Sequence, residues 1–369
     1  MTIRRITFMT HLLSSASTNR IYHSFCGGNA SAFLQCFGNG DRFYRSESRL
    51  VGEHRATNAL LYCRIYLIPE AIMRVWLQLS RWQEFLPFVA PLTVLGATLG
   101  AEAAGQPLDG RLLASLAGNL LAVAYAFMVN DIEDAADDAL DATRASRNAV
   151  ASGRLSARAA YGGCAVVAVA ALACYSLGGE RVWITGAITL ALAQLYSWRP
   201  VRLKKWALVD VASHALMLSA LLFLTGYWLY AQALGEAAWL LAAAALLSAY
   251  GQLYNQLRDA ATDRAAGLRN TTWLLGERGA RLAMYGTVVL SAYCVVQALL
   301  AGLFPVEAGV GLLLAAPLAL TMPRWAARFS PRGRDMRGSA AVDLSGALQT
   351  PALLLLNGLV AGWLVGALW

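Results

Sequence analysis

The amino-acid sequence predicts an all-α fold, a polytopic membrane bundle of nine transmembrane helices. Three observations carry this prediction. Hydrophobic residues make up 58% of the 369-residue chain and charged residues only 14%, whereas a soluble globular domain usually carries about 25% charged residues. The mean hydropathy is +0.49. Apolar runs recur along the chain, and basic residues cluster in alternate connections between them.

Nine apolar runs approach or reach the length that a helix needs to cross a bilayer, which is about 20 residues. Two of these runs, Val182–Tyr196 and Val306–Met322, are short, so their ends are the least sharply defined. The other seven are Phe85–Ala101, Leu112–Val129, Ala159–Leu177, Leu208–Leu229, Ala237–Tyr254, Leu282–Phe304 and Pro351–Trp369.

The net charge of +8 would suit a nucleic-acid ligand, but the distribution of basic residues argues against one. Connections rich in Lys and Arg alternate with connections that hold only Arg111 and Arg181. This asymmetry is typical of membrane proteins, whose basic residues concentrate on the cytoplasmic side. An omitted or additional helix would break the alternation, so the pattern supports nine spans. The basic set is Arg144, Arg147, Arg154, Arg158, Arg199, Arg202, Lys204, Lys205, Arg258, Arg264, Arg269, Arg278, Arg281, Arg324, Arg328, Arg332, Arg334 and Arg337.

Residues 1–72 differ in composition from the rest of the chain. They mix Ser, Asn, Gly, Arg and Cys without periodicity and lack the apolar core of a signal peptide. They are either a poorly ordered extension or a segment outside the native protein, which would then begin at Met73; we favour the second interpretation. The segment 73–82 suits an interfacial lead-in to the first span. The predicted transmembrane domain is residues 73–369.

The first acidic motif follows the apolar run Leu112–Val129 directly. At helical spacing Asn130, Asp134 and Asp138 form one ridge, with Asp131 beside it. Like charges stacked in this way repel one another, so we expect a cation to hold them together. A hard divalent metal ion is the favoured candidate because such ions bind carboxylate oxygens.

A second acidic motif repeats the first, 125 residues further along the chain, after the apolar run Ala237–Leu247. One acidic helix end is explained equally well by a solvated cap. Two matched copies at the ends of two apolar helices favour a shared functional site. The matched pairs are Tyr125 with Tyr250, Asn130 with Asn255, Asp134 with Asp259, and Asp138 with Asp263; Gln256 and Arg258 stand where the first copy has Asp131 and Glu133.

Basic residues occur in the connection after the first acidic motif and in the connection after the fourth span. Arg147 lies in the connection after the first motif, and Arg202 and Lys204 follow the fourth span, where Pro200 ends the helix. These cations serve either to orient the protein in the membrane or to face a polyanionic ligand between the two acidic ridges. The sequence leaves both interpretations open.

Together these residues resemble the UbiA-type intramembrane prenyltransferase family. The resemblance covers about residues 80–369. It rests on Asn130-Asp131-x-x-Asp134-x-x-x-Asp138 as the first Asp-rich motif, Asp259-x-x-x-Asp263 as the second, Arg147-Asn148 with Ser152-Gly153-Arg154 after the first motif, and Tyr196-Ser197 with Arg202-Leu203-Lys204 after the fourth helix.

The resemblance implies a nine-helix bundle around a central cavity that is capped on its cytoplasmic side. It also implies Mg²⁺ as cofactor, an isoprenyl diphosphate as donor, and a hydrophobic or aromatic acceptor within the lipid bilayer. The expected location is a bacterial cytoplasmic membrane, with both acidic motifs on the cytoplasmic side. The second motif lacks the extra acidic or Tyr residues of many aromatic-acceptor members, and is closer to quinone-precursor, chlorophyll-type and carotenoid-elongating branches. Pro200 also stands where the family has Lys.

The chemistry assigns expected roles to these residues. Mg²⁺ between two carboxylate ridges would neutralise a leaving diphosphate; its predicted ligands are Asp131, Asp134, Asp138, Asp259 and Asp263. The neutral oxygens of Asn130 and Asn255 would orient metal or phosphate. The predicted phosphate donors are Arg147, Arg202, Lys204 and Arg258. The aromatic rings expected to face an allylic cation are Tyr125, Tyr196, Tyr250 and Tyr254.

Two rival functions share parts of this pattern. A terpene cyclase on the same scaffold would use every motif, so the sequence does not separate it from a transferase. A transporter is disfavoured, because transporter sites lie near the membrane midplane, whereas these charges lie at helix ends.

In the fifth span Asp210 and His214 lie on one helix face; they are either acceptor-site groups or an interior hydrogen-bonded pair.

Overall fold

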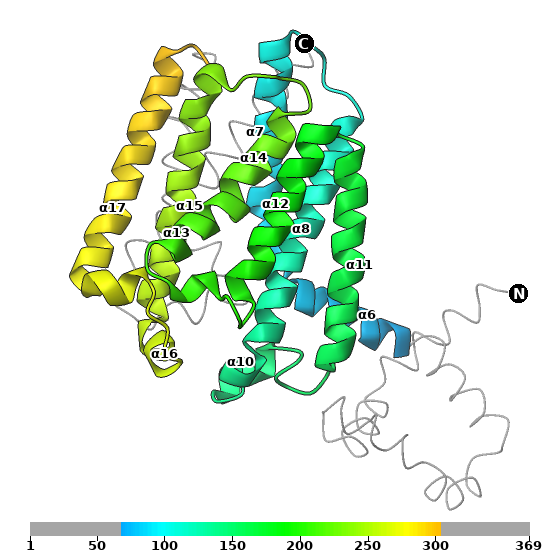
Figure 1. Ribbon diagram of the computed structural model, residues 1–369, viewed down its shortest axis with the longest axis vertical. Helices are drawn as coiled ribbons and strands as arrows, with labels where there is room; N and C mark the ends of the chain where they lie inside the picture. Colours follow the sequence, from blue (N-terminus) through cyan, green and yellow to red (C-terminus); the bar gives the residue numbers. More distant parts are fainter. Residues whose placement is uncertain (1–67, 304–369) are drawn as a thin grey trace, which may run out of the picture. The chain divides into compact units, whose positions relative to one another are not determined.

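The computed structural model describes residues 68–303 of the chain. Within this range helices are joined by turns and loops, and there is no strand (Figure 1). The chain divides into two compact units, Met1–Val75 and Trp76–Trp369. Of the first unit the structure describes only residues 68–75. The packing discussed below belongs to the second unit. The predicted extension 1–72 therefore lies almost wholly outside the described residues.

The helices follow one another in the order that the apolar runs predict. The long ones are α7 (Trp82–Ala104), α8 (Arg111–Glu133), α11 (Ala157–Ser176), α12 (Glu180–Ser197), α15 (Ala238–Arg258) and α17 (Thr271–Leu300). The predicted fifth span is α13 (Val209–Ala215) and α14 (Leu221–Tyr227), joined by a π-helical turn, Leu216–Ala220. Shorter helices are α6 (Ile68–Ser80), α9 (Ala135–Asp138), α10 (Ala142–Arg147) and α16 (Ala260–Ala265), with 3₁₀ turns at Leu203–Lys205 and Gly235–Ala237.

Six helical segments in the described residues are long and apolar enough to cross a membrane: α7, α8, α11, α13 with α14, α15 and α17. The short predicted run Val182–Tyr196 is the helix α12, whose polar Glu180, Arg181 and Gln194 lower its hydropathy below that of the six. The predicted runs Val306–Met322 and Pro351–Trp369 lie outside the described residues. The count of nine helices and the central cavity therefore stay predictions.

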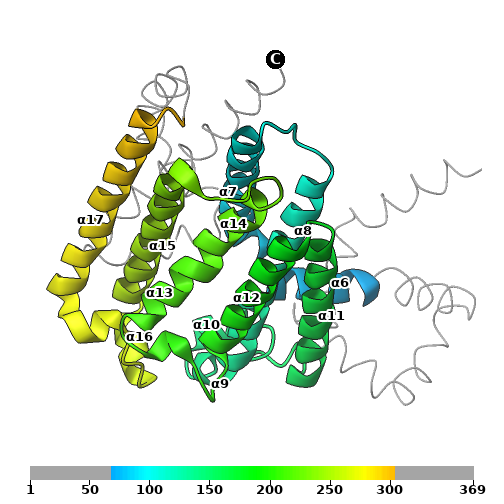
Figure 2. The ribbon, with the colours of Figure 1, turned by 45° about the horizontal axis from the view of Figure 1, so that its top comes forward.

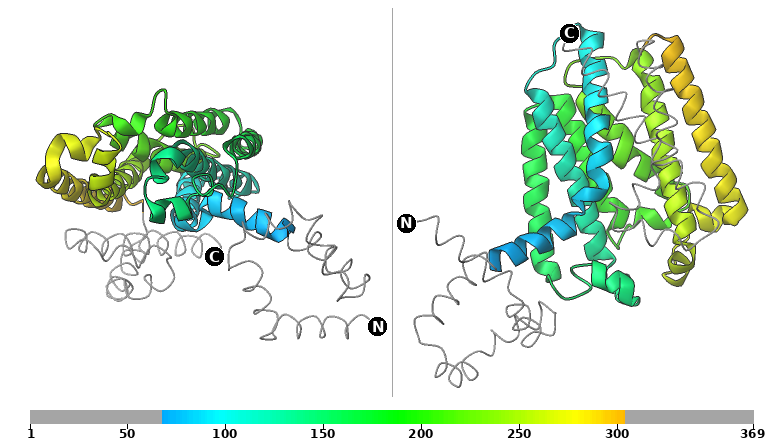
Figure 3. Two further views of the ribbon diagram at one scale, coloured as in Figure 1. Left: turned by 90° about the horizontal axis from the view of Figure 1, so that it is seen from below. Right: turned by 180° about the vertical axis from the view of Figure 1, so that it is seen from behind.

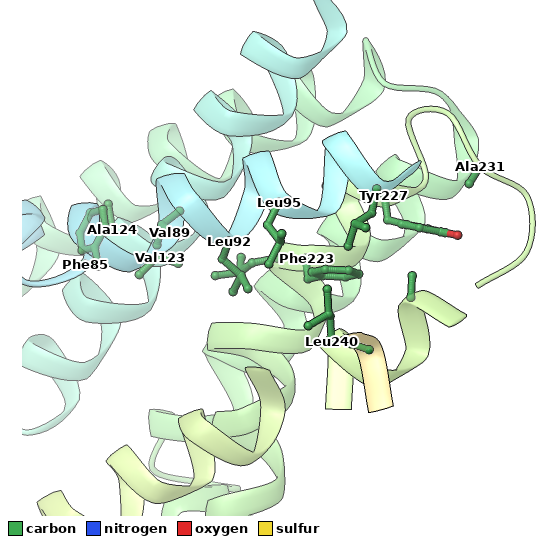
Figure 4. Packing of buried hydrophobic residues seen from close by; sticks show 14 residues of the cluster. Phe85, Val89, Leu92, Leu95, Val123, Ala124, Phe223, Tyr227, Ala231 and Leu240 are labelled. Atoms are coloured by element: carbon green, nitrogen blue, oxygen red, sulfur yellow. The ribbon is translucent and has the colours of Figure 1, made fainter. Parts of the chain in front are cut away.

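Close contact between backbones joins α7 to α14. A Cβ added to Gly226 would lie 2.2 Å from the carbonyl oxygen of Thr93, and one added to Gly96 would lie 2.2 Å from that of Phe223. Small residues at helix interfaces allow such approach, and inside a membrane close packing is a main source of helix association. The apolar cluster around this crossing includes Phe223 and Tyr227 beside Leu95 (Figure 4).

A buried asparagine ties four helices together within the bundle. Asn119 of α8 has no exposed surface. Its amide nitrogen donates to Thr93 Oγ1 of α7 at 2.7 Å and to the Leu222 carbonyl of α14 at 3.0 Å. Its amide oxygen accepts from Tyr175 of α11 at 2.8 Å and Thr225 of α14 at 2.9 Å. All four hydrogen-bonding positions of the amide are used, which offsets the cost of burying a polar group in an apolar bundle.

The packing brings the ends of the two motif helices to one end of the bundle. In Figures 1 and 2 the short helices α9, α10 and α16, which follow α8 and α15, all lie at the lower end. Helices α15 and α17 lie side by side in the views of Figures 1 and 3. The chain segments that carry both acidic motifs therefore meet at the same level.

Candidate active site

The two acidic motifs share one backbone design. Helix α8 ends at Glu133, Asp134 follows with φ −88° and ψ −4°, and α9 begins. Helix α15 ends at Arg258, Asp259 follows with φ −95° and ψ 8°, and α16 begins. The backbone N–H of each of these aspartates bonds the carbonyl of the asparagine four residues earlier at 2.9 Å. The helix thus breaks at matched positions, yet the spacing of four residues within each ridge is preserved.

Asp134 is held by two basic residues from the connection after α12. Lys204 Nζ lies 2.6 Å from both carboxylate oxygens, and Arg202 Nη2 lies 3.0 Å from one of them. Asn130 donates its amide to Asp134 at 3.1 Å and to Ser197 Oγ at 3.1 Å. The predicted residues Asn130, Asp134, Arg202 and Lys204 therefore form one cluster. It connects the end of α8 to the end of α12.

The last aspartate of each motif accepts a hydrogen bond from a buried asparagine. Asn148 donates to Asp138 at 2.9 Å, and Asn270 donates to Asp263 at 2.8 Å. Asn148 also donates to the backbone carbonyl of Asp131 at 2.7 Å, while its own oxygen accepts from the next loop. These asparagines orient the carboxylates and anchor the loop that follows each motif.

Arg144 of α10 connects the two motifs. Its Nη1 lies 3.9 Å from Asp138 Oδ1, and its Nη2 lies 3.7 Å from Asp259 Oδ1. Arg258 also contacts Asp259, with its Nη2 at 2.8 Å and its Nε at 3.1 Å from the two oxygens. One guanidinium therefore contacts a carboxylate from each ridge, although the two aspartates are far apart in the sequence.

The charges at this end perturb the acids unequally. Burial, followed by the neighbouring Asp259 carboxylate, raises the pKa of Asp263 to about 6. Partial burial opposes ionisation of Asp137, but hydrogen bonds and charges from Arg202 and Arg199 outweigh it and hold the pKa of Asp137 below its ordinary value. The charged form is therefore favoured for Asp137 and disfavoured for Asp263.

Asp131 is directed to a different partner from the rest of its motif. It is 8% exposed, and Arg81 Nη1 lies 3.1 Å from its Oδ1. The matched residue of the second motif, Gln256, donates to the buried Asp210 at 2.6 Å. Both positions tie a motif helix to a neighbouring segment. The Asp131 carboxylate thus contacts Arg81, whereas that of Asp134 contacts Arg202 and Lys204.

The predicted tyrosines fall into two groups. Tyr125 donates to Gln194 at 2.7 Å, and Tyr196 accepts from Gln252 at 2.7 Å; both rings are partly accessible. The other two, Tyr250 and Tyr254, are 3% and 2% exposed and pack in a core cluster with Leu253 and Met284. In this structure Tyr250 and Tyr254 therefore pack against other core residues.

The remaining predicted residues lie nearby or have separate partners. Asn255 is one helical turn before Asp259, and Arg147 has an exposed side chain at the end of α10. Asp210 accepts from Gln256 and from the Thr271 backbone at 2.7 Å. His214 Nδ1 instead lies 3.1 Å from Ser248 Oγ, so each of these two polar residues bonds another helix.

Several residues of this cluster were not predicted from the sequence as site residues: Arg144, Asp137, Arg199, Ser197 and Asn270. Arg144 and Arg199 belong to the basic set of the connections, which indicated their side of the membrane but not their partners. Asp137 lies inside the first motif but off its ridge. Ser197 belonged to the Tyr196-Ser197 pair of the resemblance but had no role assigned, and for Asn270 the only signal was a polar residue at a helix end.

The donor chemistry of the cluster suits a hard metal ion. The aspartates of the two motifs and the asparagines bonded to them offer carboxylate and amide oxygens, which Mg²⁺ prefers. As the side chains stand, no three Asp, Glu, His or Cys residues in the described part of the chain are close enough to hold a metal. Arg144 and Lys204 lie against the carboxylates instead. The ligand type therefore fits Mg²⁺, and binding would require these cations to move from the carboxylates.

Comparison with known proteins identifies the family. A model of the UbiA prenyltransferase family matches residues 89–345, more than half of the chain. No curated protein matches. Among solved structures, a UbiA homolog from Archaeoglobus fulgidus bound to GPP and Mg²⁺ is 24% identical, with a TM-score of 0.55 over 77% of this chain and 98% of that chain.

Two further structures have the same fold at lower identity. A UbiA homolog from Aeropyrum pernix K1 is 19% identical, with a TM-score of 0.55 over 76% of this chain and 98% of that chain. A digeranylgeranylglyceryl phosphate synthase is 15% identical, with a TM-score of 0.54 over 80% and 98%. Together with the six helices apolar enough to cross a membrane, the family match shows that this chain belongs to the UbiA prenyltransferase family and is an integral membrane protein.

Proposed function

We propose that the protein transfers a prenyl group from an isoprenyl diphosphate to a lipophilic or aromatic acceptor in the membrane, with Mg²⁺ as cofactor. The observation that carries the proposal is the meeting of the two acidic motifs, where Arg144 contacts Asp138 and Asp259 together. Similar structures from Archaeoglobus fulgidus were obtained with GPP or DMAPP and Mg²⁺, which supports this donor class and this metal.

In this proposal Asp134, Asp138, Asp259 and Asp263 would hold the metal ion, which would supply positive charge to neutralise a leaving diphosphate. Asn130 hydrogen-bonds Asp134 and keeps that carboxylate directed towards the site. Asn255 occupies the matched position of the second motif. The ligand set contains only oxygen donors from two helix ends.

The basic residues supply donors to the diphosphate. Arg202 Nε is a buried donor for which the described residues provide no acceptor, and an unsatisfied buried donor is costly. A phosphate oxygen would satisfy it. Lys204, which now contacts Asp134, and Arg258, which contacts Asp259, would turn towards the phosphate when the carboxylates bind metal.

The reaction breaks the bond between C1 of the prenyl group and the diphosphate oxygen, and both electrons leave with the diphosphate. An allylic cation remains, which an electron-rich acceptor captures at C1. Tyr196 and Tyr125 are partly exposed residues, the first at the end of α12 and the second about two turns before the end of α8, and aromatic rings stabilise cations. Exclusion of water by the bilayer prevents simple hydrolysis.

Product analysis tests the proposal. The purified protein is incubated in bilayers with Mg²⁺ and geranyl diphosphate, with and without quinone-precursor, chlorophyllide-type and carotenoid acceptors, and the products are identified by mass spectrometry. We expect a prenylated acceptor. A cyclised hydrocarbon or alcohol formed without acceptor would identify the terpene-cyclase alternative, and an unchanged donor in every mixture would overturn both.

The metal requirement should follow the oxygen-only ligands. Mg²⁺ or Mn²⁺ is expected to support turnover, whereas Zn²⁺, which prefers nitrogen and sulfur ligands, should not do so selectively. Diphosphate release is measured after removal of metal with a chelator and after each ion is added back. Full activity in excess chelator would show that the acidic motifs have another role.

The orientation proposed is that of a bacterial cytoplasmic membrane with both motifs on the cytoplasmic side. Arg144, Arg199, Arg202 and Lys204 all contact the acidic cluster, and basic residues concentrate on that side. A cysteine placed at the exposed Leu140 should resist an impermeant maleimide in intact cells and react after the cells are opened. Labelling in intact cells would reverse the orientation.

The transmembrane domain is proposed to begin at Met73. Helix α6 starts at Ile68, and its part within the second unit packs on the bundle: the Trp76 ring packs on Gly163, and Gln78 donates to the Arg147 carbonyl at 2.8 Å. A protein lacking residues 1–72 should therefore insert and turn over donor at a rate similar to that of the full chain. Aggregation or loss of activity in detergent would show that the N-terminal segment is needed.

A further inference from the structure

We infer that His214 accepts the proton that the acceptor substrate loses when it is prenylated, with Ser248, Tyr196 and Gln252 forming the polar lining of that subsite. The inference rests on the proposed function and deepens it. It identifies a base for a step in which the acidic motifs have no part. The observation behind it is a second group of polar side chains, on three helices, next to the acidic cluster.

This polar group is built from α12, α13 and α15. His214 of α13 has its Nδ1 3.1 Å from Ser248 Oγ of α15. The Tyr196 ring of α12 lies 6.2 Å from the imidazole, between ring centroids. Gln252, one turn after Ser248, donates to the Tyr196 hydroxyl at 2.7 Å. Pairwise contacts thus link four polar side chains from three helices inside the bundle.

The group lies directly beside the acidic site. Tyr196 precedes Ser197, which accepts from Asn130 of the first motif. Gln252 precedes Asp259 by seven residues on α15, a rise of about 10 Å along the helix. An acceptor that contacts this group would therefore lie within reach of the C1 atom of a donor whose diphosphate binds at the aspartates.

His214 retains the atom that a base requires. When Nδ1–H donates to Ser248, the neutral imidazole has a lone pair on Nε2. His214, Tyr196 and Ser248 each keep accessible surface. Asp210, one turn earlier, is less suited to act as the base. It has no exposed surface, and it accepts hydrogen bonds from Gln256, Thr271 and the Val211 backbone.

The chemistry requires a base at this depth. Capture of the cation forms a bond between C1 and a carbon or oxygen of the acceptor, and the acceptor then releases H⁺ from that atom. The electron pair of the broken C–H or O–H bond stays with the product. Water is scarce inside the bilayer, so a side chain has to take the proton. Of the four histidines in the chain, His214 alone lies in residues 73–369.

The experiment measures donor ionisation and acceptor prenylation separately. His214→Asn places an amide near the position of Nδ1, keeps the contact with Ser248, and removes the base. Positional isotope exchange in geranyl diphosphate without acceptor reports reversible cleavage of the C–O bond and should be unchanged, whereas the yield of prenylated acceptor should fall by about 100-fold. In His214→Ala, added imidazole should restore prenylation. Ser248→Ala, which keeps the imidazole, should lower prenylation by much less.

Each outcome bears on the inference. Normal prenylation by His214→Asn would overturn it. An equal loss of isotope exchange and prenylation, without rescue by imidazole, would show that His214 serves the fold alone and would also overturn it. Failure of the unaltered protein to release diphosphate from any isoprenyl donor would instead remove the proposed function, and this inference with it.

Discussion

Replacement of Asp259 by Asn should lower prenyl transfer by about 10²–10³-fold while the protein stays folded. Asp259 follows the last residue of α15 and contacts both Arg144 and Arg258. In the proposed reaction its charge would help to hold the metal ion that neutralises the diphosphate. The charge matters most as the C–O bond breaks, so the loss should appear mainly in kcat, with a smaller change in KM for the donor.

The amide of Asn keeps the size of the side chain and an oxygen that can accept from Arg258. Rates of diphosphate release and of product formation are measured with saturating Mg²⁺, and folding is checked by size-exclusion chromatography. A matched control is Glu180→Gln, which removes an exposed acid at the start of α12 and should leave turnover unchanged. Near-normal turnover in Asp259→Asn would rule out metal binding as the role of the motif.

Replacement of Gly226 by Ala should severely reduce the yield of folded protein. The added Cβ would lie 2.2 Å from the Thr93 carbonyl oxygen and 2.9 Å from the Ala97 nitrogen. Both atoms belong to backbone of α7, so no rotamer change relieves the overlap and α14 has to move away. Overpacking of this kind costs about 1–3 kcal/mol, occasionally more. The expected result is a large drop in the thermal midpoint and in the monodisperse fraction in detergent.

Gly162→Ala is the matched control for this variant. Gly162 is an exposed residue in the second turn of α11, and a Cβ there would meet nothing within 4 Å. Because alanine favours a helix over glycine by about 1 kcal/mol, this change should leave the thermal midpoint equal or slightly higher. A Gly226→Ala protein that melts at the same temperature as the unaltered one would contradict the close packing of α7 and α14.

The helices and the family could be predicted from the sequence because both depend on local patterns of residues. An apolar run long enough for a bilayer has to be helical, since its backbone groups find no other partners in lipid. The first seven predicted runs are helical in the structure, and the UbiA resemblance is confirmed. The two later runs lie outside the described residues. The i, i+4 spacing of each acidic motif is likewise a local property, and it survives the helix break at Asp134 and Asp259.

Only the tertiary structure decided which groups these residues contact. Asp131 and Asp134 are three residues apart, yet one contacts Arg81 and the other Lys204. Tyr196 lies in a polar group, whereas Tyr254 is buried in a core cluster.

The physical reason is that a residue's partner depends on which face of its helix meets which neighbour. That choice is made by close contacts such as that between Gly226 of α14 and the backbone of α7, and by the four hydrogen bonds of Asn119. Such contacts join residues far apart in the chain, and no spacing within a single helix encodes them. The sequence by itself therefore determined the elements and the chemistry of the ridges, and the packing decided that Arg144 lies between them.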